Sequence, residues 1–380
     1  MHLELTEEQE ILRGTTRSFL ESEAPLAMVR DLYSSPEGFD REWWRRAAEL
    51  GWTSLFVPET LGGGSLSGQS TADAVIVAEE IGRLVAPGPF LPVNLVASAL
   101  GSAGSDEQQA AVLPGLLDGT TIAAWAFSEP NGQWDTAAIA TTAIADHSGV
   151  VLDGTKAYVE AVGSADLVLV SARTGSGLTQ VLVPTNAPGV TVTRGRSIDM
   201  TRRFGKIAFD NAWLPASAVV GEVAGAQADI HRQYQLAVAL QCAGLVGATD
   251  RTLEFTLEYG RDRFAFGRPI VSFQALKHRI ADMAVLLEGS KAVTEALVAA
   301  IDDDDASTSR MASVTKAYVG EHSLDIIDDC VQITGGIGVT WEHDIHLYNR
   351  RAAVDRAVLG SPEEHKERLL VLLDAEGALQ

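Results

Sequence analysis

The chain has 380 residues, of which 46% are hydrophobic, and it carries 51 acidic against 29 basic side chains, a formal charge of −22. Because single cores stop growing near about 250–300 residues, this length predicts two or three domains. The acidic balance argues against a nucleic acid or an anionic membrane as partner, since both need a basic face. It leaves room for an anionic small molecule, which a local arginine cluster can bind.

The two cysteines, Cys242 and Cys330, lie in apolar, helix-like stretches without CxxC spacing. We therefore predict no disulfide framework and no metal site, and we expect a reducing, cytoplasmic location. The N-terminal residues lack a basic segment followed by an apolar one, so no signal peptide is predicted. The longest uncharged apolar run, about 236–248, is shorter than the ~20 residues that cross a bilayer, so no membrane span is expected.

Residues 1–118 predict an N-terminal helical domain. Thr6 is a candidate N-cap before an acidic first turn, and apolar residues recur at helical spacing over 40–50 and 71–84. Residues 58–64, Pro-Glu-Thr-Leu-Gly-Gly-Gly, indicate a loop.

At about residue 119 the pattern changes to short β-rich runs separated by Gly, Pro, Asn and Asp. Residues 119–225 therefore predict a middle antiparallel β domain, for which a barrel is the expected form and a sandwich the alternative. The expected strands lie at about 122–127, 150–152, 165–170, 180–183, 190–193 and 206–209.

From about residue 226 the helical pattern returns. It predicts a C-terminal four-helix bundle over 226–380, with helices at about 226–259, 271–300, 308–333 and 341–358. The acidic run 302–305 is interpreted as a solvated loop between helices, because four consecutive carboxylates cannot all converge on one cation. The fold class is thus a multidomain α+β protein in the order helical, β, helical.

The strongest local motif is the run Tyr-Gly-Arg-Asp-Arg-Phe-Ala-Phe-Gly-Arg-Pro-Ile-Val-Ser-Phe-Gln at 259–274. One helix ends before Gly267 and Pro269 break the chain, and another begins after them. Arg263 at such a corner can form a two-pronged contact with a phosphate. On spacing alone we favour the simpler alternative, an arginine that meets the dipole of a helix end.

This run resembles the R-x-x-F-G, then I-x-x-x-Q, hallmark of the acyl-CoA dehydrogenase family, and Ala-Asp-Met at 281–283 follows in the family's order. The resemblance implies that Arg263, Phe266 and Gln274 contact the adenosine diphosphate part of FAD. It also implies that they do so across a dimer interface, in the cofactor site of the neighbouring subunit.

A second segment, Gln-Ile-Thr-Gly-Gly-Ile-Gly at 332–338, resembles the family's Q-x-x-G-G-x-G. Taken alone, such glycines mark only a helix end and a turn. The resemblance implies that Gln332, Gly335 and Gly336 touch the FAD diphosphate of the partner subunit.

Residues 124–130 and 154–160 resemble the middle-domain strands that line the flavin ring, which implies ring contacts for Phe127, Ser128 and Tyr158. Tyr158 stands where the family commonly has Trp. Glu160 stands where a small hydroxyl residue usually contacts the flavin, and a carboxylate is poorly placed against the electron-rich edge of the ring.

The sequence Asn-Gly-Gln-Trp-Asp at 131–135 replaces the expected Gly- and Ser-rich stretch. The alternative is that these segments are sheet strands with no contact to a cofactor. Residues 203–210 and 58–63 also resemble family segments, so that the resemblance covers nearly the whole chain, from about 5 to 368.

The base that removes the α-proton is missing from the two places where relatives carry it. That proton is weakly acidic, so the family reaction needs a positioned carboxylate. Relatives place a Glu just before a glycine near the C-terminus, where this chain has Leu359 before Gly360. Others place it seven residues before a glycine on the first helix of the C-terminal domain, where this chain has Ala237 before Gly244.

Asp355 is the weak candidate for a substitute base, because it lies one helical turn from Leu359. An ion pair with Arg351 at helical spacing is the alternative.

Three hypotheses follow. The first is a subunit without its own base that completes the FAD site of a second family subunit in an α2β2 assembly, as in actinobacterial acyl-CoA dehydrogenases for steroid-derived thioesters. The second is a self-sufficient homo-oligomeric flavoenzyme whose chemistry needs no α-proton abstraction. The third is a cofactor-free structural subunit. The acyl group and the electron acceptor are not readable, although Ala237, Ala239 and Gly244 leave room either for a bulky acyl group or for close helix packing.

Overall fold

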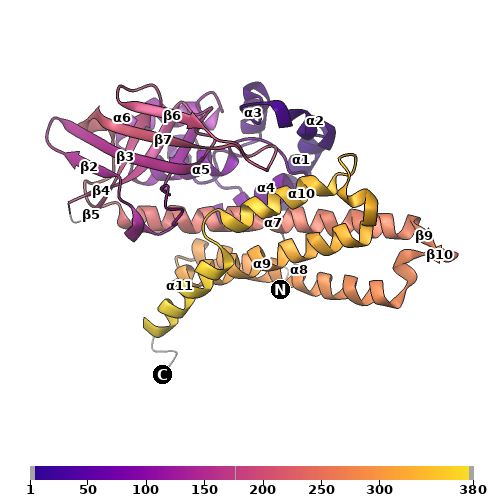
Figure 1. Cartoon of the computed structure of the whole chain (residues 1–380). Coiled ribbons are helices and arrows are strands. Elements are labelled where there is room, and N and C mark those ends of the chain that lie inside the picture. Colours follow the sequence, from indigo (N-terminus) through magenta and orange to yellow (C-terminus); the bar gives the residue numbers. More distant parts are fainter. Residues whose placement is uncertain (1–4, 176, 376–380) are drawn as a thin grey trace. The chain divides into compact units, whose positions relative to one another are not determined.

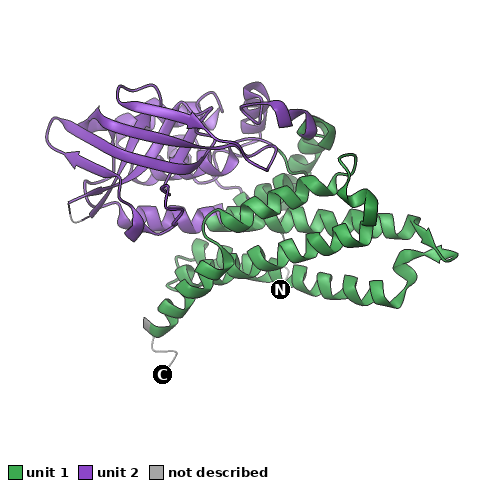
Figure 2. Cartoon of the chain, viewed as in Figure 1, with its two compact units in different colours: residues 1–29, 74–86, 238–380 green, residues 30–73, 87–237 purple. Residues whose placement is uncertain are grey.

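The computed structural model describes residues 5–175 and 177–375, and the chain divides into two compact units (Figures 1 and 2). Unit 1 comprises residues 1–29, 74–86 and 238–380, and unit 2 comprises residues 30–73 and 87–237. Three of the four boundaries fall inside helices α2 (Leu26–Asp31), α4 (Ser70–Arg83) and α7 (Gln227–Asp262), and the fourth, between residues 86 and 87, follows α4. The boundaries of the three predicted domains remain a prediction.

Unit 2 is built around one eight-stranded sheet with the order β6-β7-β3-β2-β4-β5-β8, to which β1 adds by pairing with β4. Most neighbours are antiparallel, as predicted, but β1 and β2 each run parallel to β4. Among the described residues β6 and β8 pair with one strand each, so a closed barrel is not confirmed. The strands are β1 (Ala123–Ala126), β2 (Thr142–Ala145), β3 (Gly149–Glu160), β4 (Leu167–Thr174), β5 (Gly177–Pro184), β6 (Val190–Arg194), β7 (Phe204–Pro215) and β8 (Val219–Val220).

The helices of unit 2 begin at polar caps that their sequence supplies. The Asp40 carboxylate accepts from the Trp43 amide at 2.9 Å to start α3 (Arg41–Ala48). Ser105 and Gln108 form a capping box at α6 (Asp106–Leu117), and the Gln108 side chain also donates to the Val219 carbonyl. The other helical segments are α5 (Phe90–Ala103), η1 (Leu32–Ser34), η2 (Glu59–Leu61), η3 (Thr136–Ala138) and η4 (Ala216–Ala218).

Unit 1 is helical. Thr6 and Gln9 form a capping box that starts α1 (Glu7–Glu23), which confirms the predicted N-cap; residues 1–4 of the N-terminal stretch lie outside the described residues. The long C-terminal helices lie close to the predicted ranges, and α11 was not predicted. They are α7, α8 (Gln274–Asp302), α9 (Thr308–Thr334), α10 (Ile345–Ala357) and α11 (Pro362–Ala375), with the short segments β9 (Phe264–Ala265), β10 (Arg268–Pro269), η5 (Ile270–Ser272) and η6 (Gly335–Val339).

Small residues let helices α4 and α7 pack closely within unit 1. A methyl group added at Gly82 would collide with the carbonyl of Gly244, and one added at Gly247 would collide with the carbonyl of Glu79. The Tyr348 hydroxyl on α10 donates to the Arg83 carbonyl at 2.8 Å and fixes the end of α4. No helix in the described part of the chain is long and apolar enough to cross a membrane.

Candidate functional site

The first group of predicted site residues lies at a two-residue β-hairpin in unit 1. Strands β9 and β10 pair antiparallel, and Phe266 and Gly267 form the turn between them with φ angles of 53° and 80°. Two successive left-handed residues are typical of a type I′ turn, which usually has Asn or Asp first. A bulky residue in that conformation is strained, and the Phe266 side chain is 96% exposed.

The hairpin tip is braced on the aromatic ring of Phe273. The Phe266 ring meets the Phe273 ring edge-on at a centroid distance of 6.2 Å, and the Arg268 guanidinium lies 4.0 Å above the centroid of the same ring. Arg263 stands at the base of the hairpin, where its carbonyl accepts from the Ile270 amide at 2.9 Å. Its guanidinium is exposed, and the contacts of the described residues include no partner for it.

Gln274, Gly335 and Gly336 come to the same end of unit 1 because α8 and α9 are antiparallel (Figure 1). An ion pair joins Arg279 to Asp329 at 2.5 Å, and the Thr315 hydroxyl donates to the Val293 carbonyl at 2.8 Å. Both pairs set the helices in one register, in which Gln274 is level with Thr334. The first amides of α8 are therefore near the last turn of α9, and the Phe273 side chain does not cap them.

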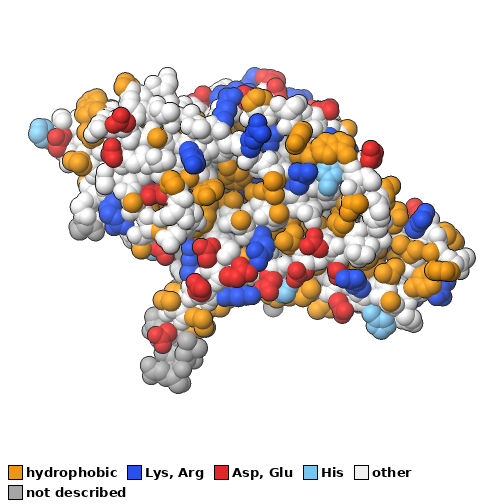
Figure 3. Space-filling view, viewed as in Figure 1, with side chains coloured by type: hydrophobic (Ala, Val, Ile, Leu, Met, Phe, Trp, Pro, Cys, Tyr) orange, Lys and Arg blue, Asp and Glu red, His pale blue; other side chains and the backbone are white. Residues whose placement is uncertain are grey.

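The glycines after α9 leave an open approach to the backbone. Gly335 has a φ angle of 70°, and a methyl group added to Gly335 or Gly336 would meet no atom within 4 Å. Gln332 lies one turn earlier on α9 and is exposed. Hydrophobic side chains gather over the β9–β10 end of unit 1 in Figure 3. An arginine, uncapped helix amides and exposed glycine backbone together fit a phosphate group.

The second group of predicted residues, Phe127, Ser128 and Tyr158, belongs to unit 2 and is placed differently. Phe127 is 2% exposed and stacks on Trp125 at a centroid distance of 5.1 Å. The Ser128 side chain is buried as well, and its hydroxyl donates to the Gln133 carbonyl at 2.8 Å. Tyr158 is half exposed at a bulge of β3, with a left-handed φ angle of 55°.

A buried ion pair, which the sequence did not reveal, holds the end of β1. The Lys156 ammonium donates to the Glu129 carboxylate and to the Phe127 carbonyl, both at 2.9 Å. Burial lowers the pKa of Lys156 to about 8. Burial alone would raise the pKa of Glu129, but the Lys156 charge and the Thr141 amide together lower it. The only sequence signal was the position of Lys156 inside a strand.

The two positions at which the resemblance predicts a base are apolar and buried. Ala237 is fully buried, and Leu359 is 2% exposed with a left-handed φ angle of 66°. The Leu359 carbonyl accepts from the Nε2 atom of His365 at 2.9 Å, which also identifies that nitrogen as the protonated one. Burial lowers the pKa of His365 to about 3, so that the ring is neutral at physiological pH.

Asp355, the weak candidate for a substitute base, is buried in the last turn of α10. The buried Lys316 ammonium donates to its backbone carbonyl. Burial raises the pKa of the nearby Cys242 thiol to about 12; the Lys316 charge lowers this pKa and the Asp355 charge raises it. These side chains are buried in the core of unit 1 and form a packed polar cluster.

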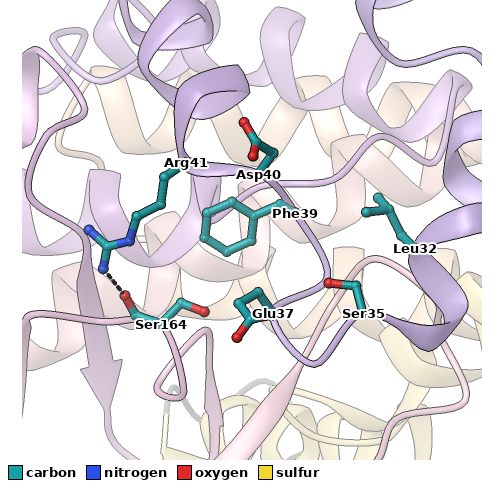
Figure 4. A pocket seen from close by; sticks show the side chains of 7 residues that line it. All are labelled: Leu32, Ser35, Glu37, Phe39, Asp40, Arg41 and Ser164. Carbon is teal, nitrogen blue, oxygen red and sulfur yellow. Dashed lines mark hydrogen bonds between the residues drawn. The ribbon is translucent and has the colours of Figure 1, made fainter.

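A separate hollow of about 460 Å³ lies in unit 2 (Figure 4). Its charged side chains are already engaged: Arg41 binds Asp166 at 3.0 Å and the Ser164 carbonyl, Glu37 binds Arg194 at 3.1 Å, and Asp40 caps α3. It contains none of the predicted site residues. The hollow is lined by Leu32, Ser35, Glu37, Phe39, Asp40, Arg41 and Ser164.

The chain matches three family models along most of its length. They describe the N-terminal domain of acyl-CoA dehydrogenases over residues 6–120, the middle domain over 124–212 and the C-terminal domain over 233–370. It is 34% identical to acyl-CoA dehydrogenase IpdE2 of Mycolicibacterium smegmatis over 96% of this chain and 98% of that protein. The Mycobacterium tuberculosis protein of the same name is 33% identical over 96% of each.

Solved structures agree with this match. A steroid acyl-CoA dehydrogenase named Tcur3481-Tcur3483 has a TM-score of 0.87 and is 29% identical over 98% of this chain and 99% of that one. An acyl-CoA dehydrogenase from Geobacillus kaustophilus has a TM-score of 0.90 and is 25% identical over 98% of this chain and 100% of that one. The fold and these matches define the class, and the chain belongs to the acyl-CoA dehydrogenase family.

Proposed function

We propose that the chain is a subunit of an FAD-dependent acyl-CoA dehydrogenase that completes the FAD site of a partner subunit and supplies no catalytic base. The carrying observation is the hairpin tip, where a strained Phe266 is displayed to solvent instead of being packed. Strained residues persist where function requires them, so this side chain is built for contact with another molecule.

The residues at this end of unit 1 suit the diphosphate part of FAD. Arg263 offers a planar pair of donors, and Gly335 and Gly336 let a phosphate approach their amides. Gln274 and Phe266, at the same end of unit 1, would contact the same nucleotide. Bound FAD would supply the hydride acceptor for the α,β-dehydrogenation of an acyl-CoA thioester.

The proton-transfer step has no group to perform it at the family positions in this chain. Ala237 and Leu359 are hydrocarbon side chains and cannot accept the α-proton. In the proposed α2β2 assembly the partner subunit supplies the carboxylate, and this chain supplies the surface that holds the partner's cofactor. We place the assembly in the cytoplasm, in line with the two buried free thiols.

We further propose a bulky, steroid-derived acyl group as the substrate. The similarity to a steroid acyl-CoA dehydrogenase supports it. The small residues on α7 do not add support, because Ala237 and Ala239 are fully buried and Gly244 packs closely against α4. The test compares turnover of the purified complex with a polycyclic acyl-CoA and with a straight-chain acyl-CoA. Equal or better turnover of the straight-chain thioester would count against the proposed substrate.

The test of the assembly is co-purification. The chain is expressed alone and together with each family subunit encoded beside it, and bound FAD per chain is measured from flavin absorbance. We expect little FAD and no dehydrogenase activity in the isolated chain, and one FAD for each pair of chains in the complex. Full flavin and turnover in the isolated chain would instead support a self-sufficient flavoenzyme. A complex that never binds FAD would support a structural subunit.

A further inference from the structure

We propose that the turn at 131–135 and the ion pair between Glu160 and Arg202 occupy the flavin-ring face of unit 2, so that this chain cannot hold a flavin ring on its own middle domain. This inference rests on the proposed function and names what closes the chain's own site. Of the residues expected to contact the ring, Phe127 and Ser128 are covered by the chain itself, whereas Tyr158 is half exposed.

The turn lies directly over the end of strand β1. The Trp134 ring stacks on the Phe127 ring at a centroid distance of 6.1 Å with an interplanar angle of 6°, and the Trp125 ring stacks on Phe127 at 5.1 Å with an angle of 21°. Phe127 is thus engaged by two indoles. Tyr234 adds a tilted contact at 5.8 Å. Such stacked aromatic pairs add stability beyond the area that they bury.

Hydrogen bonds fix the turn in this position. The Ser128 hydroxyl donates to the Gln133 carbonyl at 2.8 Å, and the Gly132 amide donates to the Glu129 carbonyl at 2.9 Å. A methyl group added at Gly132 would lie 4.0 Å from the Tyr158 ring, so the turn reaches from Phe127 to Tyr158. The predicted contacts Phe127, Ser128 and Tyr158 all face this turn.

The ion pair blocks the place where relatives carry a small hydroxyl residue. The Arg202 guanidinium binds the Glu160 carboxylate through two nitrogens, at 2.8 and 2.5 Å, and the side chains are 10% and 11% exposed. Arg202 also lies 5.2 Å from the centroid of the Phe204 ring. A two-pronged pair of this kind is rigid, and breaking it would leave a buried charge. A flavin edge would have to displace it.

The experiment opens the face in two ways. One variant, Trp134→Ala, removes the indole; the other, Glu160→Thr with Arg202→Met, removes both charges together so that neither is left unpaired. The control is Trp213→Ala, which removes an exposed indole from strand β7 of the same sheet. Thermal unfolding of each isolated chain verifies folding, and FAD affinity is measured by flavin fluorescence.

We expect the combined Trp134, Glu160 and Arg202 variant to bind FAD at least about tenfold more tightly than the natural chain, and the Trp213 control to be unchanged. In the complex, the combined variant should raise bound FAD from one toward two for each pair of chains. The Glu160/Arg202 variant alone keeps the aromatic stack and tests the ion pair if the Trp134 variant fails to fold.

The outcomes separate this inference from the proposed function. A folded combined variant without gain in FAD, in a complex that still holds one FAD per pair, overturns the inference and leaves the proposed function standing. A natural complex that already holds one FAD for each chain overturns both. A gain of the same size in the Trp213 control would show that the effect is unrelated to the ring face.

Discussion

Phe266 allows a prediction in which stability and function separate. We replace it with Asn, the residue type that tolerates the left-handed conformation. Because the side chain is 96% exposed, the isolated chain loses mainly the edge contact with Phe273, about 0.5–1.5 kcal/mol. Relief of the backbone strain returns about 1 kcal/mol. The free energy of unfolding should therefore change by less than about 1 kcal/mol.

The effect on the assembled complex should be much larger. A phenylalanine that becomes buried against a ligand or partner contributes about 1.5–3 kcal/mol, which corresponds to an increase of about 10- to 150-fold in the dissociation constant for FAD. The assay is fluorescence titration of the flavin-free complex with FAD, next to urea unfolding of the isolated chain. The control is Ile144→Asn, which alters a side chain on β2 in unit 2 that is 73% exposed.

Either of two results would contradict a role of Phe266 in cofactor binding. One is unchanged FAD affinity of the Phe266→Asn complex, because the strained residue would then have no role in cofactor binding. The other is a loss of more than about 2 kcal/mol in the isolated chain, because Phe266 would then be a packing residue. A loss of FAD affinity as large in the Ile144→Asn control would remove the specificity of the argument.

Three further predictions concern the phosphate contact, the buried ion pair and the missing base. Arg263→Ala should lower the FAD affinity of the complex about tenfold or more, since charge-assisted bonds contribute about 1.5–3 kcal/mol. The control Arg261→Ala changes an arginine that is also exposed near the end of α7, and it should leave the FAD affinity unchanged. Equal effects of the two variants would contradict a specific contact. Because the pKa of Glu129 is lowered in the folded chain, its pairing with Lys156 stabilises unit 2 at pH values above the usual carboxyl pKa, and this stabilisation is lost as the pH falls below about 4.5. Urea unfolding across this pH range should show the loss of stability. The Glu129→Gln variant should show a weaker dependence of stability on pH. Leu359→Glu should lower the midpoint of thermal unfolding, because it buries a carboxylate at a cost of about 2–4 kcal/mol. The variant should not give the isolated chain dehydrogenase activity in a dye-reduction assay. Turnover by the isolated variant would contradict the proposal.

The elements that the sequence predicted well are those whose signals are local. The Thr6 N-cap and the long apolar periods of α7 to α10 depend on residues within one or two turns. The missed elements lack such signals. Strand β2 is a four-residue run rich in Ala, and the hairpin turn uses Phe-Gly in place of the usual Asn-Gly or Asp-Gly.

The contacts that define the site were harder to predict from the sequence, because they join residues that are far apart in the chain. Glu160 and Arg202 are 42 residues apart, and Lys156 and Glu129 are 27 apart. Only the folded sheet brings them together. The stacking of Trp134 on Phe127 depends on the path of a turn that no residue pattern specifies. The sequence could mark Glu160 as an unusual residue, but it could not show that an arginine neutralises it.

The predicted site residues fall into two sets. Those predicted to serve a neighbour's cofactor, Arg263, Phe266 and the glycines at 335 and 336, are exposed and lie together at one end of unit 1. Of those predicted to serve the chain's own flavin and substrate, Phe127 and Leu359 are buried and already engaged, whereas Tyr158 is half exposed. A self-sufficient enzyme needs both sets accessible, whereas a subunit that only completes its partner needs the first. Selection for catalysis would oppose a buried leucine at the base position, while selection for packing favours it, because a buried leucine contributes about 1.5–3 kcal/mol that a carboxylate there would forfeit. The asymmetry between the two sets is therefore what the proposed division of labour between two unlike subunits would produce.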